Sequence, residues 1–212
     1  MVQNNYMLNC GYAGSTVGGI YIGSKGYGVC TDKRGGYVIK YNTVKNTARS
    51  SLTLQMTEGA KWATSNSGHN AAFMPSDISY NEFADGSFCA WDTGVVYLWG
   101  ATMGSETDYT QLHHNVVYMT ASPAKTIHSF IYHDNFISNI ETRDNVIFYT
   151  NENAKPAYGT DGILVQNKTQ FPIAWSEAIL HDNQYLEYRS KGLSSLTASD
   201  YPDGLEFHAG VR

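Results

Sequence analysis

Residues 39–44 read IKYNTV, in which an asparagine stands between an aromatic residue and two strand-forming residues. The same order of branched or aromatic residue, Asn and apolar residue recurs along the chain. The asparagines are Asn5, Asn42, Asn81, Asn115, Asn145 and Asn183. Their spacings are 37, 39, 34, 30 and 38 residues, and Asn135 in IYHDNF offers a second register ten residues before Asn145. A unit of this length, repeated along the whole chain, predicts a solenoid.

A second landmark alternates with the asparagines: a glycine followed by a short strand-forming run. The copies are GGIYIG, TGVVYLWG, DGILVQN and DGLEFH. Alternate side chains of a strand point to opposite faces. The first and third positions after the glycine are apolar in every copy, so we expect them to point inward. These positions are Ile20 and Ile22, Val95 and Tyr97, Ile163 and Val165, and Leu205 and Phe207.

Each unit therefore holds at least two short strands, and no unit can bury its apolar face alone. Stacked units would form a continuous core, with the Asn amides bonded from coil to coil. We expect an all-β chain, residues 1–212 forming a single parallel β-helix domain of about six coils. The repeat begins at once and the sequence stops just after a glycine-led run, so we expect a fragment of a longer protein or ends covered by partner subunits.

The ladder QNNYMLNCG, VIKYNTVKNT, ISYNEFADG and LHHNVVYMT, with GGIYIG and TGVVYLWG between, resembles the right-handed parallel β-helix superfamily. That superfamily includes pectate-lyase-like polysaccharide lyases, glycoside hydrolases, sugar epimerases and phage tailspikes. Residues 77–115 are similar to secreted β-helix proteins grouped with carbohydrate-active enzymes. The resemblance implies a right-handed β-helix that acts on a polysaccharide.

Composition narrows the classes of partner. The net charge is −5 and no Lys/Arg-rich run occurs, so we expect no nucleic-acid binding. No apolar stretch of about 20 residues occurs, so we expect no membrane span. Sixteen tyrosines among few charged residues suit a neutral polar ligand such as a glycan.

Acidic residues lie before the glycine-led strands and are the candidate catalytic groups. Asp161 and Asp203 directly precede a glycine, and Asp92 lies one residue earlier. Equivalent positions of neighbouring coils stack about 4.8 Å apart, and glycosidases use two carboxylates about 5–9.5 Å apart. We assign catalysis to Asp92 with Asp161 or Glu106 as its partner. The alternative is that each Asp only starts a turn.

Aromatic, histidine and acidic residues are the candidate substrate-binding groups. They are Trp91, Trp99, His114, His133, Asp203 and Glu206. Flat aromatic faces stack on apolar sugar faces, and Trp91 and Trp99 flank the strand beside Asp92. We expect no metal or other cofactor. A calcium or zinc ion held between histidines and carboxylates of adjacent coils is the alternative.

The function we expect is that of a glycoside hydrolase acting on a polysaccharide, as a monomer. The first alternative is a glycan-binding or adhesion module such as a phage tailspike fragment, which would be a trimer. The second is a polysaccharide lyase, which the sparse Lys and Arg residues disfavour. We expect an extracellular or cell-surface location, or a virion for a tailspike.

Overall fold

The computed structural model describes residues 1–11, 18–24, 34–56, 73–90, 92–99, 108–121, 127–134, 137, 139–166, 178–189, 194 and 196–200. Three long sheets contain most of them. Sheet A holds β1 (Val2–Gln3), β5 (Val38–Lys40), β9 (Asp77–Ser79), β12 (Thr110–His113), β15 (Ile140–Arg143) and β18 (Ile179–His181). Sheet B holds β2 (Tyr6–Leu8), β6 (Thr43–Lys45), β10 (Glu82–Ala84), β13 (Val116–Met119), β16 (Val146–Tyr149) and β19 (Gln184–Tyr188).

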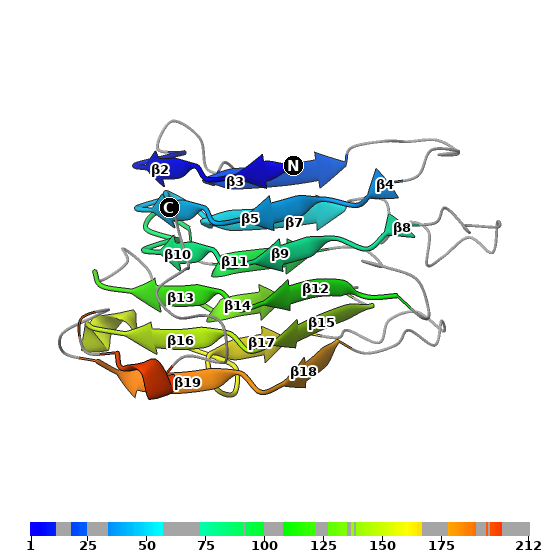
Figure 1. Cartoon of the computed structure of the whole chain (residues 1–212). Helices are drawn as coiled ribbons and strands as arrows, with labels where there is room; N and C mark the ends of the chain where they lie inside the picture. The colour runs from blue at the N-terminus through cyan, green and yellow to red at the C-terminus, as the bar shows by residue number, and fades with distance from the viewer. Residues whose placement is uncertain are drawn as a thin grey trace.

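Sheet C holds β3 (Ile20–Ser24), β7 (Leu52–Met56), β11 (Gly94–Trp99), β14 (Ser129–His133) and β17 (Ile163–Val165). A small pair joins β4 (Arg34–Gly35) to β8 (Phe73–Met74), and two 3-10 turns are η1 (Glu152–Ala154) and η3 (Ala198–Asp200). All the strand pairs of the three long sheets are parallel. The chain passes through sheets A, B and C in turn and then repeats the circuit, so the strands lie in layers (Figure 1). The prediction of an all-β parallel β-solenoid is confirmed.

The asparagine ladder joins successive coils at the corner between sheets A and B. The side chains of Asn5, Asn42, Asn81, Asn115 and Asn145 each donate from Nδ2 to Oδ1 of the next ladder asparagine, over 2.9–3.0 Å. The backbone N–H of each of these five residues donates to the same oxygen, over 3.0–3.1 Å. The sequence separations across these bonds are the predicted spacings, and Asn145 rather than Asn135 occupies the ladder.

The residue before each ladder asparagine turns the chain from sheet A to sheet B. These residues are Asn4, Tyr41, Tyr80, His114, Asp144 and Asp182, with φ between 51° and 57°. The left-handed conformation thus belongs to the residue before each ladder asparagine and not to the asparagine itself. The asparagine is instead occupied by bonds between coils, so its neighbour adopts the left-handed geometry, at a cost of about 1–2 kcal/mol per residue.

The interior consists of columns in which each coil contributes one apolar side chain. In sheet A, Ile39, Ile78 and Leu112 follow one another and are fully buried. In sheet B the corresponding column is Val44, Phe83, Val117 and Ile147. Burial of each such side chain contributes roughly 1.5–3 kcal/mol. The core therefore gains stability coil by coil, as expected for stacked repeats.

The interior face of β11 differs from the prediction. Val96 and Leu98 pair with the buried leucines of β7 and continue the interior columns, whereas Tyr97 lies on the outer face. Val95 is buried at the corner, as predicted. The shift arises because Gly94 aligns with the first of the two glycines before β3, not with the second. A Cβ at Gly94 would lie 2.9 Å from a backbone oxygen of β14, so the close approach of the coils requires glycine there.

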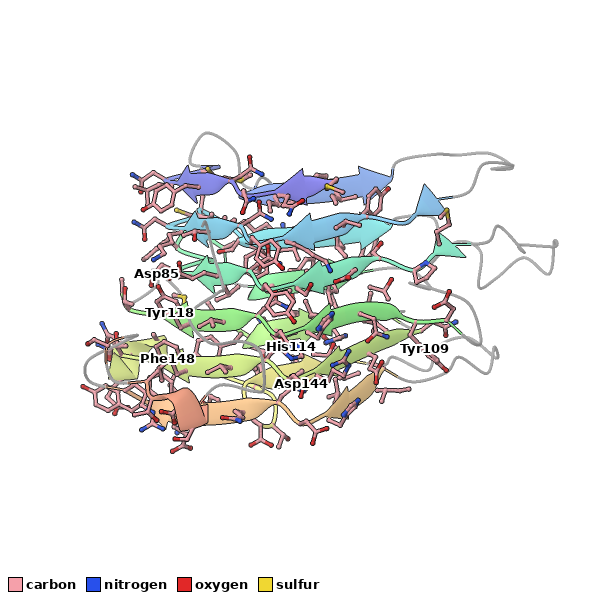
Figure 2. The ribbon with its side chains drawn as sticks, viewed as in Figure 1. Asp85, Tyr109, His114, Tyr118, Asp144 and Phe148 are labelled. Carbon is pink, nitrogen blue, oxygen red and sulfur yellow. The ribbon has the colours of Figure 1, made fainter. Side chains whose placement is uncertain are left out.

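Side chains also stack on the outer face of sheet B. The rings of Tyr118 and Phe148, from neighbouring coils, lie 4.8 Å apart and 5° from parallel (Figure 2). Leu196, just before η3, packs against this cluster. Within the described ranges there is no helix that is both long enough and apolar enough to cross a membrane.

The ladder predicts a position-dependent loss of stability. Asn115→Ala would leave the buried carbonyl of Ile78 without its donor and break the chain of amide bonds on both sides. We expect a loss of about 3–5 kcal/mol in the free energy of unfolding, measured by urea denaturation. The matched variant Asn5→Ala, at the end of the ladder, should lose about 1 kcal/mol. Equal losses at the two positions would contradict the ladder's role.

One interior column carries a histidine. His133 is fully buried, in register with Leu98 and Val165. Its Nε2 lies 3.2 Å from Oγ1 of Thr142, and its Nδ1 is buried without a hydrogen-bond partner. Burial lowers the pKa of His133 to about 4. The folded protein therefore keeps this ring neutral where an exposed histidine would be protonated.

This histidine predicts a loss of stability in acid. Because its folded pKa lies below the unfolded value of 6.5, the contribution is complete above pH 6.5 and is lost as the pH falls toward 4. The loss should reach about 3 kcal/mol near pH 4, in urea titrations across this range. The double variant His133→Leu/Thr142→Val should lack this part of the pH dependence. An unchanged pH profile in that variant would show that another group is responsible.

Candidate functional site

Asp92 lies at the corner between sheets B and C, in the coil of β11. Its side chain is 59% exposed, and Oδ1 lies 3.8 Å from Nε2 of His128 in the next coil. Arg49, from the preceding coil, lies at the same corner, with its guanidinium 5.1 Å from the centre of the Tyr97 ring. A cation, a carboxylate and an imidazole thus come from three consecutive coils. The stacking of coils, not proximity in sequence, brings them together.

Aromatic rings extend from Asp92 toward the following coil. The ring of His128 stacks on Tyr132, with centroids 5.4 Å apart and planes 3° apart. The His128 ring also contacts Tyr158, with ring centroids 5.1 Å apart and planes 39° apart. Tyr158 is 58% exposed, so it presents a ring to solvent beside the exposed carboxylate. We call Asp92, His128 and Tyr158 the Asp92 surface, and the buried Tyr132 ring supports His128 from below.

A second carboxylate, Asp134, lies beneath this surface. It is buried and accepts a hydrogen bond of 2.6 Å from the hydroxyl of Tyr97 and one of 3.1 Å from that of Tyr132. The Tyr132 hydroxyl also contacts Oε1 of Gln166. Burial raises the pKa of Tyr132 well above its usual range, and the charges of Asp134 and Asp92 raise it further. Both carboxylates therefore lie close to one phenol.

The expected partner of Asp92 lies elsewhere. Strand pairing aligns Val96, Ile131 and Ile163, so Asp161 is two coils from Asp92 and also two residues further along the strand direction. Asp161 lines a cavity of about 470 Å³ with Leu164, Leu180, His181 and Asp182, below the last strand of sheet C. Among the described residues, no hydrogen bond joins Asp161 to Asp92.

Four of the predicted site residues lie outside the described residues: Trp91, Glu106, Asp203 and Glu206. Trp99 is half-buried, at the end of β11, and shares the outer face with Tyr97. His133 lies in the core, where a surface ligand would not meet it. His114 lies at the corner between sheets A and B, away from the Asp92 surface, and its ring packs 5.3 Å from that of Tyr80.

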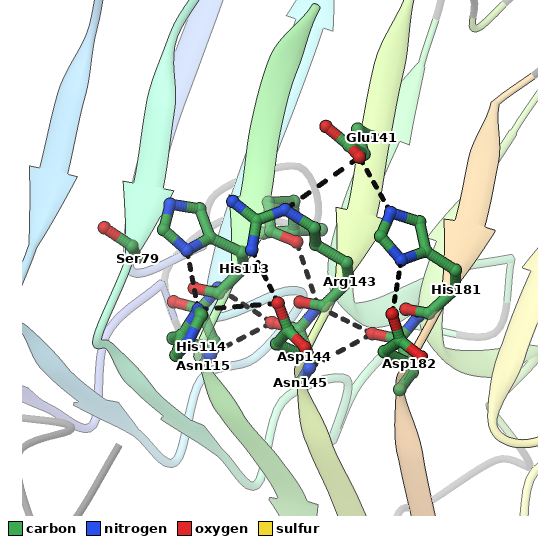
Figure 3. Close-up of polar contacts among 12 residues, drawn as sticks. Ser79, His113, His114, Asn115, Glu141, Arg143, Asp144, Asn145, His181 and Asp182 are labelled. Carbon is green, nitrogen blue, oxygen red and sulfur yellow. Dashed lines mark hydrogen bonds and ion pairs between the residues drawn. The ribbon is translucent and has the colours of Figure 1, made fainter. Parts of the chain in front are cut away.

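Figure 3 shows the polar strip that His114 joins along this corner. The Nδ1 atoms of His113 and His114 are 2.7 Å apart, so one of the two carries the shared hydrogen. The Asp77 carboxylate lies 3.3 Å from Nε2 of His113 through Oδ1 and 2.5 Å from Nζ of Lys40 through Oδ2. Burial alone would raise the pKa of Asp77, but hydrogen bonds from His113, Lys40 and Ser79 hold it well below its usual range.

The strip continues through the last two coils. Arg143 pairs with Asp144 at 2.5 Å, and His181 lies 2.7 Å from both Glu141 and Asp182. Hydrogen bonds to Asp182 and Glu141 raise the pKa of His181. Each charged side chain of the strip has an opposite charge beside it. The strip therefore serves mainly to link neighbouring coils. Among the described residues, no group of three or more His, Cys, Asp or Glu side chains is arranged to hold a metal ion.

Sequence reasoning missed Tyr132, Asp134 and Tyr158. The signal for the first two was present: TGVVYLW and HSFIYHD occupy the same slot of the repeat, which aligns Tyr97 with Tyr132. Tyr158 comes from the corner between β16 and β17 that contains η1, and neither sequence landmark of the repeat includes it.

No family model matches the chain, and comparisons with curated proteins and with solved structures also find no match. The parallel β-solenoid fold is therefore the extent of the structural classification.

The strip makes a prediction about His181. Glu141→Gln removes one of its two carboxylate partners, so the pKa of His181 should fall toward 6.5 while the Asp182 contact keeps it above that value. The ion pair stabilises the fold while His181 is protonated, and this contribution is lost as the pH rises through its raised pKa. An NMR titration of the imidazole measures the shift. Asp77→Asn, in the same sheet but not in contact with His181, should leave the pKa unchanged; an equal fall in both variants would contradict the assignment.

Proposed function

We propose that this protein is a carbohydrate-active solenoid that binds a neutral glycan at the Asp92 surface, in an extracellular or cell-surface setting. The observation that supports the proposal is the exposed Asp92 carboxylate beside the exposed Tyr158 ring, with His128 between them. Sugars offer hydroxyls to a carboxylate or imidazole and apolar ring faces to an aromatic side chain. The Asp92 surface offers both kinds of contact side by side.

The stacked rings also favour a pre-organised site. His128 is held between Tyr132 and Tyr158, and the Tyr132 hydroxyl is fixed by Asp134. Side chains that are ordered before binding lose little conformational entropy when a ligand arrives. The half-buried Trp99, at the far end of β11 on the same sheet face, offers a further aromatic side chain.

A second candidate function is hydrolysis at this same surface. Glycoside hydrolysis uses two carboxylates; Asp134 accepts a hydrogen bond from the Tyr132 hydroxyl, and the charges of Asp134 and Asp92 both raise the pKa of that hydroxyl. In this candidate Asp134 replaces Asp161 as the second carboxylate. Asp92 is the group that a bound glycan would meet, because Asp134 is buried beneath the tyrosines.

Binding is tested by affinity electrophoresis of the protein against a panel of neutral polysaccharides. Tyr158→Ala should raise the Kd about tenfold for any glycan that the wild type binds, because the ring supplies the apolar stacking face. The control is Tyr6→Ala, which removes an equally exposed ring, 61% against 58%, from sheet B. Absence of binding across the panel, or equal weakening by the two variants, would refute the glycan site.

Hydrolysis is tested by release of reducing ends from the glycans that bind. Asp92→Asn should lower the rate at least about 100-fold while leaving the fold intact, because a proton-transfer group is worth that much or more. Asp182→Asn, which alters another exposed carboxylate, should retain activity. Binding without any release of reducing ends by the wild type would reject hydrolysis and leave the protein as a glycan-binding module.

A further inference from the structure

The two ends of the described solenoid expose apolar side chains. The first coil exposes Tyr6 and Leu8, at 61% and 44%, and the last exposes Ile179, Leu180 and Tyr188, at 41–45%. Exposed sheet edges are sites where another chain can add strands, and natural proteins usually protect them with lysine or proline. The edge strands β1, β2, β18 and β19 contain neither residue.

The interior columns of the two ends match. Val2 begins the sheet A column that ends at Leu180, and Met7 begins the sheet B column that ends at Tyr185. If the first coil of one copy stacked on the last coil of another, each apolar column would continue across the junction. Strand direction would also be preserved, because every coil runs the same way around the solenoid.

The asparagine ladder has a direction, and its two ends are complementary. Each ladder asparagine donates its backbone N–H to Oδ1 of the next, so the first ladder residue has a spare acceptor and the last a spare donor. Within the described structure, Oδ1 of Asn5 receives no hydrogen bond and the backbone N–H of Asn183 has no acceptor. Stacking the first coil of one copy on the last coil of another would join these two groups.

A second hydrogen bond of the ladder repeats in the same way. Inside the solenoid Nδ2 also donates to a carbonyl of the preceding coil, as Asn42 does to Val2 and Asn183 to Thr142. The corresponding acceptor for Asn5 would be the carbonyl of Leu180 in a second copy, because Leu180 pairs with Thr142 in the sheet A register. In sheets A and B the junction would thus repeat the bonding of any two adjacent coils.

We propose that copies of this chain associate end to end, the last coil of one against the first coil of the next. The partner is a second copy because its opposite end supplies the matching register, apolar columns and amide. This contact joins two different surfaces, so it is heterologous and leaves a free end at each stage. Association should therefore produce an open series of oligomers rather than a closed dimer.

The test is sedimentation velocity across low to high micromolar concentrations. The wild type should show a weight-average mass that rises continuously with concentration. Leu180→Lys places an inward charge at one end and Val2→Lys at the other, and each should abolish the rise. Met74→Lys alters a similarly exposed apolar residue in β8, away from both ends, and should associate like the wild type.

Mixing the two end variants provides the decisive step. The intact first coil of Leu180→Lys can dock on the intact last coil of Val2→Lys, and the product has no functional free end. We expect each variant alone to be monomeric and the mixture to form a one-to-one heterodimer, with unchanged far-UV circular dichroism. A monomeric wild type, a closed dimer, or a mixture that stays monomeric would overturn the proposal. If either variant fails to fold, Asn5→Ala in the wild-type background should still weaken association, and unaltered association there would overturn it.

Discussion

The amide ladder between Asn5 and Asn183 is the interaction on which the rest of the structure depends. Each ladder residue between these two ends bonds to ladder asparagines of the coils on both sides, and the left-handed residue before it sets the corner between sheets A and B. Once that corner is fixed, the positions of the side chains in sheet B follow, and so do the interior columns. The cost of six left-handed residues is offset because each allows buried amides to be fully bonded.

The corner between sheets A and B could be predicted from the sequence because the ladder asparagines recur in it at similar spacings. An asparagine followed within two residues by an apolar residue marks the same corner in every coil, whatever the length of the loops between coils. The glycine landmark was less informative, since Gly94 is required for close approach of the coils and not for a fixed place in the strand. Gly94 therefore lies one position earlier in the strand register than Gly19 and Gly162, and Tyr97 faces outward. For His133, too, the strand register decides the position of the side chain. Its imidazole suggested contact with a ligand, but its register with Leu98 places it in the core.

The candidate site was only half predictable for a related reason. Asp92 stood out because it departs from the repeat, and it does lie exposed at a corner. Which residues lie beside Asp92 depends on the strand register between neighbouring coils. The loops between strands vary in length, so this register cannot be read from the sequence. Asp161 resembles Asp92 in sequence yet lies two residues out of step, whereas Asp134 follows its strand and comes close to the same phenol as Asp92. Stacking also explains why Arg49, Asp92 and His128 meet although more than 30 residues separate each from the next.

Native-state hydrogen exchange of the ladder amides tests the central role of the ladder most directly. The backbone amides of Asn42, Asn81, Asn115 and Asn145 are held by the next coil's side-chain oxygen, so opening them requires separation of coils. They should be among the slowest to exchange in the protein, with opening free energies close to that of global unfolding. Exchange of these four amides as fast as that of the amides in the exposed turns would contradict the account.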